Sequence, residues 1–269
     1  MLDAHPPTFT PLASPRSFRL LKLLALRVPV IQEQRYGLTL CNFHLDNCPE
    51  YLALSYTWRK ALYLSIECTE DEDPQMSTEE PCQVLLGHVP AGEDYTTGPT
   101  NITGSLFTIT ENLLDALVQL ASSGYADKWL WIDALCIDQS NSDEKGIQVA
   151  MMGEIYSKAS QVIVWLGSDT SNLEDFLWLN TEFLAGIGHY IQEFGVEDLM
   201  KQTPFSYKLL EFMKLQPPSG DWVICWENYM SFCRRRRWFS RIVRLPIYVR
   251  AETKTFIWIW QELDSNIYV

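Results

Sequence analysis

The sequence predicts an α/β fold in which a mostly parallel central sheet is flanked by helices. Apolar strands alternate with amphipathic helices: strands expected at residues 129–137 and 161–167 lie on either side of a helix expected at residues 142–159. Strands that are apolar on both faces are typical of parallel sheets covered by helices on both sides. A chain of 269 residues that is 47% hydrophobic can bury about 75% of its unfolded surface in one large core.

The first part of the chain predicts a tail followed by strands. Residues 1–16 contain four prolines and are expected to form a disordered N-terminal tail. Residues 17–24 and 36–43 mix apolar and polar positions in a way that predicts two strands, although the first segment is equally compatible with a short helix. Residues 51–58, YLALSYTW, predict a firmer strand.

An acidic loop, two short strands and a helix follow. Residues 67–81 are acidic and poor in large apolar side chains, which predicts a mobile surface loop. Short strands are expected at residues 83–89 and 105–109. A helix then begins at the predicted N-cap Thr110 and stops at Gly124, because the apolar residues between them recur at helical spacing.

The C-terminal half predicts further helices. The inner face of the helix at residues 142–159 is expected to consist of Val149, Met152, Ile155, Tyr156 and Ala159. Ser171 and Glu174 have the spacing of a capping box ahead of a helix at residues 173–185. Pro217 and Pro218 separate the last two of three more helices, which are expected at residues 196–200, 205–213 and 222–239.

The composition argues against several classes of function. The formal net charge of −13 repels a nucleic-acid backbone or an anionic membrane surface, so neither is an expected partner. The basic block Arg234–Arg237 is compatible with a nuclear-import signal or a phosphate-binding patch, but a solvated helix face is the favoured interpretation. Seven cysteines without a CxxC pair, together with four scattered histidines, predict no disulfide framework and no metal site. No signal peptide or membrane span is evident, so a cytoplasmic location is expected, with the nucleus as the alternative.

Candidate site residues follow the strand expected at residues 129–137. In an open parallel sheet, ligands bind in the crevice beyond the carboxyl ends of the strands. Asp138 and Gln139 lie at that edge, where Asp138 is also compatible with a simple turn residue. Asp133 is expected inside the strand, where its carboxylate needs a partner and either braces a loop or lines a site. Cys136 is expected to be a packed core thiol, because no histidine near it in the sequence could act as its base.

Glu144 has two interpretations. It stands three residues after Asn141, which is the spacing of a capping box. It also lies in the first turn of a helix beside the expected crevice, where an acid could serve in catalysis or bind a ribose. The sequence contains no glycine-rich phosphate loop and none of the common hydrolase motifs. The residues by themselves therefore predict an α/β domain with an acidic crevice and no required cofactor.

Several blocks of the sequence, taken together, resemble the fungal heterokaryon-incompatibility (HET) domain. The blocks occur in the family's order: YLALSYTW at 51–58, ITENLLDAL at 109–117, LWIDALCIDQ at 130–139, the residues Glu144, Gln148, Met152, Ile155, Tyr156 and Ala159, and VIVWLG at 162–167. FRLLKL and LTLCNF ahead of them are similar to the opening of the family. The resemblance covers about residues 17–262.

This resemblance implies a domain organisation. It implies a single HET-like domain at residues 17–269, with a core at about 51–186 and a helical C-terminal part at about 190–262. Because the HET domain is thought to be related in fold to the Toll/interleukin-1 receptor (TIR) domain, it also implies a TIR-like or flavodoxin-like core with added N-terminal strands and C-terminal helices.

The resemblance further implies an effector of fungal non-self recognition that leads to programmed cell death, as a form of innate immunity. Some TIR domains hydrolyse NAD with a glutamate, so NAD is an expected substrate, with Glu144 and Asp133 as the expected catalytic acids. Residues expected to contact the nucleotide are Tyr56, Trp58, Asp138, Gln139 and Gln148. Expected partners are other incompatibility proteins, NLR-type proteins or a second copy of the chain. The alternatives are a non-catalytic scaffold that acts by self-association and a degenerate, inactive gene product.

Two positions depart from the family pattern. The family usually has glycine after the tryptophan of its first block, where this chain has Arg59, and arginine resists positive φ or a close backbone approach. The family's late block is continuous, whereas here RRWFSRI ends at Ile242 and WIWQEL starts at Trp258. Residues 243–257 are therefore expected to be an insertion within one helix. The insertion is either translated intron, since Val-Arg can be encoded by the splice-donor sequence GTAAGA, or a genuine loop.

Overall fold

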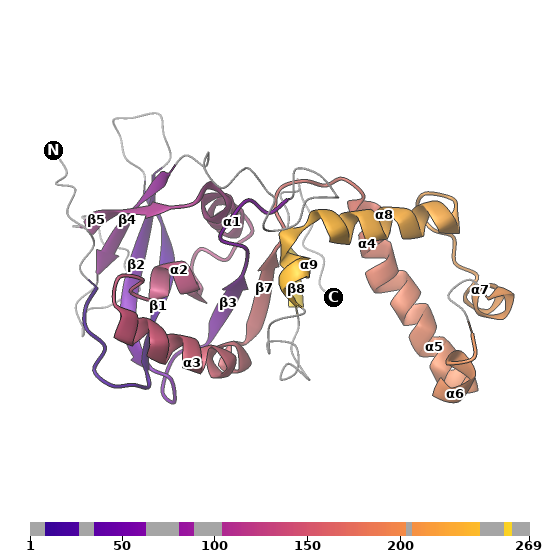
Figure 1. Cartoon of the computed structure of the whole chain (residues 1–269), viewed down its shortest axis with the longest axis horizontal. Helices are drawn as coiled ribbons and strands as arrows, with labels where there is room; N and C mark the ends of the chain where they lie inside the picture. The colour runs from indigo at the N-terminus through magenta and orange to yellow at the C-terminus, as the bar shows by residue number, and fades with distance from the viewer. Residues whose placement is uncertain are drawn as a thin grey trace.

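The computed structural model describes residues 9–26, 35–62, 81–88, 104–202, 206–242 and 256–259. Its centre is one eight-stranded sheet with the strand order β5-β4-β2-β1-β6-β3-β7-β8 (Figure 1). The strands are β1 (Ser17–Leu26), β2 (Arg35–His44), β3 (Tyr51–Ser55), β4 (Cys82–His88), β5 (Gly104–Ile109), β6 (Trp129–Trp131), β7 (Gln161–Trp165) and β8 (Phe256–Ile259). The α/β class and the strands expected in the first 110 residues are therefore confirmed.

The sheet is mixed, with four parallel and three antiparallel pairings, so the expectation of a mostly parallel sheet is not confirmed. β3 pairs in parallel with β6 and β7, and β8 adds to β7 in parallel. β1 and β2, however, pair antiparallel over ten residues, from Ser17 opposite His44 to Leu26 opposite Arg35, and β1 also runs antiparallel to β6. Consecutive strands with a short connection pair antiparallel, whereas parallel neighbours need a longer crossover. The alternating strands and helices predicted only the part of the sheet made by β6, β3 and β7.

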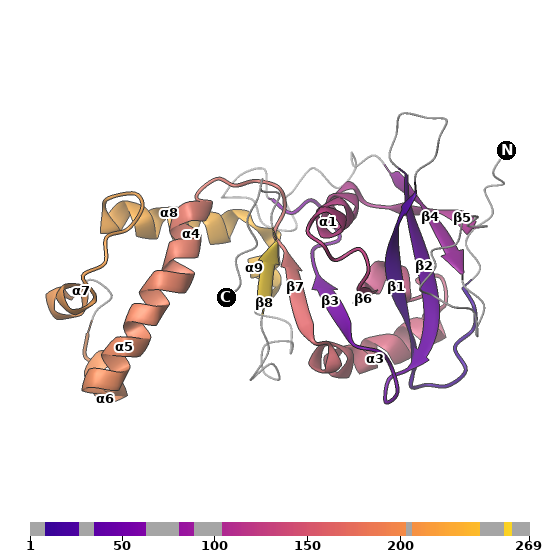
Figure 2. The same ribbon diagram turned by 180° about the vertical axis from the view of Figure 1, so that it is seen from behind.

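Nine α-helices lie in the described residues. They are α1 (Glu111–Ser122), α2 (Asp133–Cys136), α3 (Ser142–Lys158), α4 (Leu173–Trp178), α5 (Leu184–Phe194), α6 (Val196–Leu199), α7 (Tyr207–Met213), α8 (Trp222–Arg235) and α9 (Arg237–Ile242), and a π-helical turn at Leu179–Phe183 joins α4 to α5. Helix α3 covers one face of the sheet, and Figure 2 shows the sheet from behind with α3 on its far side. Helices α4 to α8 form an arm that extends away from the sheet, with α6 and α7 at its tip.

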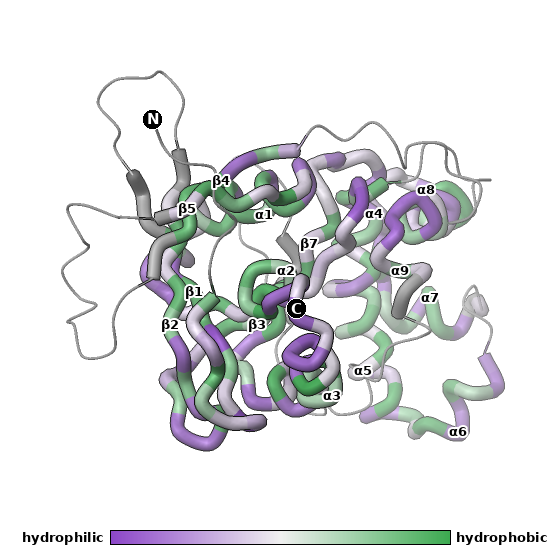
Figure 3. Tube along the Cα trace, turned by 60° about the vertical axis from the view of Figure 1, so that its left-hand side comes forward, coloured by the Kyte–Doolittle hydropathy of each residue, from purple (hydrophilic) through white to green (hydrophobic). Residues whose placement is uncertain are grey.

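The core joins the strands to α1, α2 and α3. Buried apolar residues from β1, β3, β6 and β7 pack with Leu113, Leu117 and Leu120 of α1 and with Leu135 of α2 in one cluster. Figure 3 shows the same apolar character as green trace along α1 and α2. Ile155 and Tyr156 of α3 and its C-cap Ala159 are buried, and Met152 packs against the cluster, as expected. Val149 is exposed, which contradicts its predicted place on the inner face.

Two of the three helix ends that the sequence predicted, at Thr110, Gly124 and Ser171, are confirmed. The Thr110 hydroxyl accepts a hydrogen bond from the Leu113 amide and caps α1, and Gly124 after the helix has φ +82°, so both predicted ends of α1 are confirmed. The capping box at Ser171 was wrong. Asn172 is the N-cap of α4, lies in the left-handed region at φ 61° and makes no side-chain capping bond.

The basic block Arg234–Arg237 was misinterpreted as a solvated helix face. Arg236 is 1% exposed and Arg237 is 2% exposed, and the chain is extended at Arg236, which divides the single helix expected at residues 222–239 into α8 and α9. Arg236 donates to the carbonyls of Phe232 and Asp169. Burial lowers the pKa of Arg236 to about 10. The second half of the block is therefore part of the interior, whereas Arg234 is exposed on α8, as predicted, and the side chain of Arg235 is 34% exposed.

The remaining segments singled out in the sequence lie mostly near the two ends of the chain. Residues 9–16 contain no helix or strand, yet Phe9 packs against the core and its ring meets Phe107 edge to face. The acidic segment at residues 67–80 and residues 243–255 lie outside the described residues. Trp258 lies in β8, beside Val164 of β7, and not in a helix that continues from Ile242.

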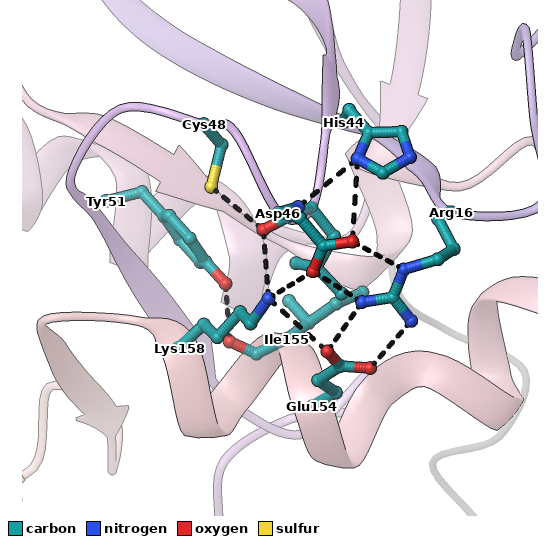
Figure 4. A network of polar contacts seen from close by, with 9 residues as sticks. Arg16, His44, Asp46, Cys48, Tyr51, Glu154, Ile155 and Lys158 are labelled. Carbon is teal, nitrogen blue, oxygen red and sulfur yellow. Dashed lines mark hydrogen bonds and ion pairs between the residues drawn. The ribbon is translucent and has the colours of Figure 1, made fainter.

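A network of charged side chains ties the start of β1 to the end of α3 (Figure 4). Arg16 donates to both carboxylate oxygens of Asp46, at 2.8 and 2.6 Å, and to both oxygens of Glu154, at 3.2 and 2.8 Å. Lys158 donates to Asp46 at 2.6 Å. Arg16 and Lys158 hold the pKa of Asp46 well below its usual range, and Arg16 lowers the pKa of Glu154. These side chains are partly exposed, so salt screens the network.

We expect Asp46 to stabilise the fold at neutral pH and to lose that effect in acid. Its pKa in the folded state is depressed, so its contribution is present above the carboxyl pKa of the unfolded chain, about 4, and is lost as the pH falls below that value. The Tm of the Asp46→Asn variant should be lower than that of the unchanged chain at pH 7, and the difference should shrink below about pH 4 and in 1 M salt. A Tm difference that is independent of pH and salt would contradict the role of the network.

Candidate functional site

The carboxyl ends of three parallel strands meet at one edge of the sheet. Ala53 of β3 lies opposite Trp131 of β6, and Ser55 lies opposite Val164 of β7. The segments that leave these strands, Tyr56–Leu62, Ile132–Gln139 and Leu166–Asp169, therefore begin side by side. We call this region the carboxyl edge. It is the position where ligands bind in parallel α/β sheets, and it contains most of the residues that the sequence singled out.

Asp133 is not inside a strand, because β6 ends at Trp131 and Asp133 is the first residue of α2. Its Oδ2 accepts a hydrogen bond from Nε1 of Trp58 at 2.9 Å, and its Oδ1 accepts from the Ala134 amide at 2.7 Å. Trp58 is 39% exposed, so one side of its indole faces solvent while its N–H is held. The half-buried carboxylate of Asp133 thus fixes a partly exposed aromatic ring at the carboxyl edge.

Gln139 and Asp138 form the loop that follows α2. Nε2 of Gln139 donates to the Asp133 carbonyl at 3.0 Å, which joins the loop to the start of α2. Oδ1 of Asp138 accepts from the Ser140 amide at 3.0 Å and from its hydroxyl at 2.6 Å. Asp138 therefore acts as the turn residue that one interpretation of the sequence expected. Trp58, Asp133, Asp138 and Gln139 are brought together at the carboxyl edge.

Tyr56 and Gln148 lie below this surface. Tyr56 is buried in the core cluster. Gln148 is 1% exposed on α3, and its Nε2 donates to the Ser17 carbonyl at 2.8 Å. The structure thus places both residues where they support the sheet, away from the side chains that face solvent.

Glu144 is engaged in a buried ion pair. Its two carboxylate oxygens accept from Nη1 and Nη2 of Arg19 at 2.5 and 3.0 Å, and one of them also accepts from the Asp138 amide at 2.8 Å. The side chain of Arg19 is 0% exposed and that of Glu144 is 10% exposed. Asn141 caps α3 with its own side chain, whose oxygen accepts from the Glu144 amide, but the Glu144 carboxylate reaches Arg19 and Asp138. Glu144 therefore anchors the Asp138 loop to β1.

Cys136 is a packed core thiol, as predicted. It is 0% exposed, and burial raises the pKa of the thiol to about 12. A thiol with this pKa is neutral at physiological pH and is a poor nucleophile.

Sequence reasoning missed Asn112, which organises the carboxyl edge. This buried side chain of α1 donates through Nδ2 to the Thr57 carbonyl at 2.6 Å and to the Arg59 carbonyl at 3.0 Å. Its Oδ1 accepts from Nε1 of Trp165 at 2.8 Å. The signal was a polar residue on the apolar stripe of a helix, in line with the buried Ala116 and Leu120.

Arg59 fits the loop after β3 without strain. Its φ is not positive, and its carbonyl accepts from Asn112 and from the Thr57 hydroxyl. The close approach in this region belongs to Gly167 after β7, at φ +95°, where an added Cβ would lie 2.5 Å from the Ala61 side chain. The expected need for glycine therefore applies to position 167 rather than to position 59.

The C-terminal helices close over the same loop. The Arg237 amide donates to the Ala61 carbonyl at 3.0 Å, and Nε1 of Trp238 donates to the Ser55 hydroxyl at 2.9 Å. Arg236 and Leu62 form an isolated β-bridge. Residues from the two ends of the matched pattern, the block at 51–58 and RRWF at 236–239, thus touch at the carboxyl edge.

The comparison with known protein families agrees with this arrangement. A family model described as heterokaryon incompatibility protein (HET) matches residues 51–262. The chain belongs to the heterokaryon incompatibility family. The match begins at β3 and leaves out β1 and β2, which the resemblance had included from residue 17.

A curated relative has the same family name. The chain is 28% identical over 201 residues to heterokaryon incompatibility protein 6, OR allele, of Neurospora crassa. The aligned part is 72% of this chain but 26% of the relative, so the chain spans about a quarter of the length of that HET protein. No solved structure matches the chain.

Two further observations concern the described residues of this HET domain. No helix in the ranges that the structure describes is long and apolar enough to cross a membrane. Within the same ranges, no three His, Cys, Asp or Glu side chains are grouped so that they could hold a metal ion.

We expect loss of the Arg19–Glu144 pair to destabilise the fold strongly. Glu144→Gln leaves the buried charge of Arg19 without its counter-charge, so the free energy of unfolding should fall by about 3–5 kcal/mol in urea titrations. Asp143→Asn is the matched control, because Asp143 is exposed in the same helical turn and should change stability by less than about 0.5 kcal/mol.

A double variant separates the charge from the packing. Arg19→Met combined with Glu144→Leu removes both charges and should recover part of the stability that Glu144→Gln loses. Equal stability of Glu144→Gln and the unchanged chain would contradict a structural ion pair.

Proposed function

We propose that this chain is the effector module of a fungal non-self recognition system, in which its activation leads to programmed cell death. The support is the family match over residues 51–262, together with the printed name of the Neurospora crassa relative. The observation that carries the proposal is the meeting of three of the family's blocks at Asn112, because the same motifs that define the resemblance build one edge of the fold. Its partners would be other incompatibility proteins or NLR-type proteins in the cytoplasm or nucleus.

The proposed chemistry is hydrolysis of NAD at the carboxyl edge. Trp58 offers a partly exposed aromatic face on which a nicotinamide or adenine ring could stack. The Asp133 carboxylate is within hydrogen-bond distance of the same indole, so a stacked nucleotide would bring its ribose near a negative charge. This pairing of an aromatic face with a carboxylate favours the nucleotide proposal and gives Asp133 the central role.

In the proposed reaction the bond between ribose C1′ and the nicotinamide nitrogen breaks. The electron pair of that bond goes to the positively charged ring nitrogen, and nicotinamide leaves as a neutral molecule. Asp133 would stabilise the oxocarbenium-like ribosyl centre by its charge. Water then bonds to C1′ and loses a proton to solvent, which gives ADP-ribose. Glu144 would act as a positioning residue, because its oxygens already accept from Arg19 and from the amide of Asp138.

A second candidate function is a non-catalytic scaffold that acts by self-association. Large apolar side chains on the arm favour it, since Val196, Met200 and Val223 are more than half exposed. Contiguous exposed apolar patches mark interaction surfaces, and these side chains would contribute to such a surface. The two functions differ in whether NAD is consumed.

We expect induced expression in a fungal host to lower cellular NAD and kill the cells, and Asp133→Asn to reduce NAD loss by at least about a hundredfold, because it removes the charge that faces the ribosyl centre. Asp143→Asn is the matched control and should behave like the unchanged chain, since Asp143 is exposed and is not among the residues proposed to contact NAD. Each version is expressed with and without residues 243–257, and sequencing of the transcript establishes whether those codons are spliced out.

The outcomes separate the proposals. Death with steady NAD would support the scaffold and exclude the hydrolase. No death and no NAD loss, with or without residues 243–257, would indicate a degenerate product. NAD loss only in the version without residues 243–257 would identify that segment as inactivating.

A further inference from the structure

Helices α6 and α7 lie at the tip of the arm, next to α5 (Figure 1). Three aromatic rings from α5 and α7 cluster there. The ring centroids of Tyr190, Phe194 and Phe212 are 4.7, 5.3 and 5.4 Å apart. The ring of Phe212 is inclined by 90° to Tyr190 and by 76° to Phe194, so the rings face different directions around one corner. Tyr190 is buried, whereas Phe194 is 43% exposed and Phe212 is 37% exposed.

A lysine of the same chain occupies this corner. Nζ of Lys208 lies 4.6 Å from the ring centroid of Phe194 and 5.6 Å from that of Tyr190. It also donates to Oδ2 of Asp198 at 2.7 Å. The Tyr190 hydroxyl donates to the same oxygen at 2.5 Å, and Nε2 of Gln202 lies 3.4 Å from it. The tip site, formed by Tyr190, Phe194, Asp198 and Phe212, thus holds an ammonium group between aromatic faces and one carboxylate.

We propose that the tip site binds the ammonium group of a lysine from a partner protein, and that Lys208 fills it when the partner is absent. The occupant defines the chemistry: an ammonium is attracted to the negative faces of aromatic rings and to a carboxylate. The Lys208 ammonium lowers the pKa of Asp198, because a neighbouring cation favours the charged carboxylate. This inference concerns the arm and does not depend on the proposed hydrolysis of NAD.

The surroundings of the tip site are suited to an exchange of lysines. The side chain of Lys208 is 48% exposed and that of Asp198 is 30% exposed, so an incoming group can reach both. Phe194 and Phe212 are themselves partly exposed. Val196 of α6 and Met200, which directly follows α6, are also exposed. A partner segment in which a lysine is flanked by apolar residues would match these features.

A partner lysine has to compete with Lys208 for the tip site, so it needs additional binding contacts. Because Lys208 is attached to the same chain, its effective concentration at the site is high, of millimolar order or above. A single unmodified lysine in solution would therefore displace it poorly. A partner would bind more tightly by adding apolar contacts to α6. Methylation of its lysine would also raise the affinity, because aromatic faces bind methylated ammonium groups well.

The test empties the site and probes it with tetramethylammonium. In Lys208→Ala, the methyl protons of tetramethylammonium should shift upfield in NMR titrations because they approach ring faces, and binding should be at least about tenfold tighter than to the unchanged chain. Lys208→Arg is the matched control, because arginine keeps a cation in the site and should bind no more tightly than the unchanged chain. Adding Phe194→Leu to Lys208→Ala keeps apolar volume but removes a ring, and should weaken binding by at least about tenfold.

A second variant without the Lys208 ammonium and an uncharged probe serve as further controls. Lys208→Ser should behave as Lys208→Ala does, with circular dichroism confirming that both are folded. Neopentyl alcohol, which has a similar shape without charge, should bind none of the variants measurably. The proposal is overturned if neither emptied variant binds tetramethylammonium, if the unchanged chain binds it equally well, or if the Phe194→Leu double variant keeps full affinity.

Discussion

The side-chain amide of Asn112 is the interaction on which the architecture of the carboxyl edge depends. A buried amide has to be hydrogen-bonded, because leaving its donors or acceptor without partners costs the full desolvation of those groups. Here both donors go to main-chain carbonyls after β3, and the oxygen accepts from the indole of Trp165 at the end of β7. One side chain of α1 therefore sets the relative position of two parallel strands and the loop between β3 and residue 62.

That loop in turn holds the C-terminal helices. Its Ala61 carbonyl accepts from the Arg237 amide, and the end of β3 accepts from Trp238 through Ser55. The buried Arg236 joins α8 to the segment after β7 through the carbonyl of Asp169. The arm, although it extends away from the sheet, is thus fixed to the same edge as the candidate site. Glu144 likewise holds the Asp138 loop in place, by accepting a hydrogen bond from the Asp138 amide. Trp58 is a large apolar side chain at this edge that faces solvent.

The sequence predicted local features well where one physical signal dominated. Mixed apolar and polar positions located β2 and left β1 as either a strand or a short helix, and the hydroxyl of Thr110 with the glycine at 124 located the ends of α1. The pattern of apolar and polar residues could not predict the direction of β1 and β2 relative to β6. That direction depends on how the β1–β2 hairpin joins the part of the sheet made by β6, β3 and β7. Asp133 was placed in a strand because WLWIDALCI is continuously apolar apart from that residue, but three residues of pairing with β3 suffice before the chain turns into α2.

The sequence predicted where the candidate site residues lie, but it did not predict which side chains they contact. Trp58, Asp133, Asp138 and Gln139 do gather at the carboxyl edge, as expected from their places after strands. The partner of Glu144 could not be read from the chain, since Arg19 is 125 residues away. Its signal was an arginine directly flanked by apolar residues in a predicted strand, because a charge buried there needs a carboxylate from elsewhere in the fold. The arginines at 236 and 237 were misplaced for the same reason: charge runs usually face solvent, and their buried carbonyl partners are distant in sequence.

Hydrogen exchange is the measurement that tests the organising role of Asn112 most directly. Amide exchange is followed by mass spectrometry in the unchanged chain, in Asn112→Ala and in Val118→Ala, a control at an exposed position of the same helix. If Asn112 fixes the edge, Asn112→Ala accelerates exchange in residues 57–62 and 236–239, while the paired amides of β1 and β2 keep their protection and Val118→Ala changes neither region. Unchanged exchange in residues 57–62 of Asn112→Ala would contradict that role.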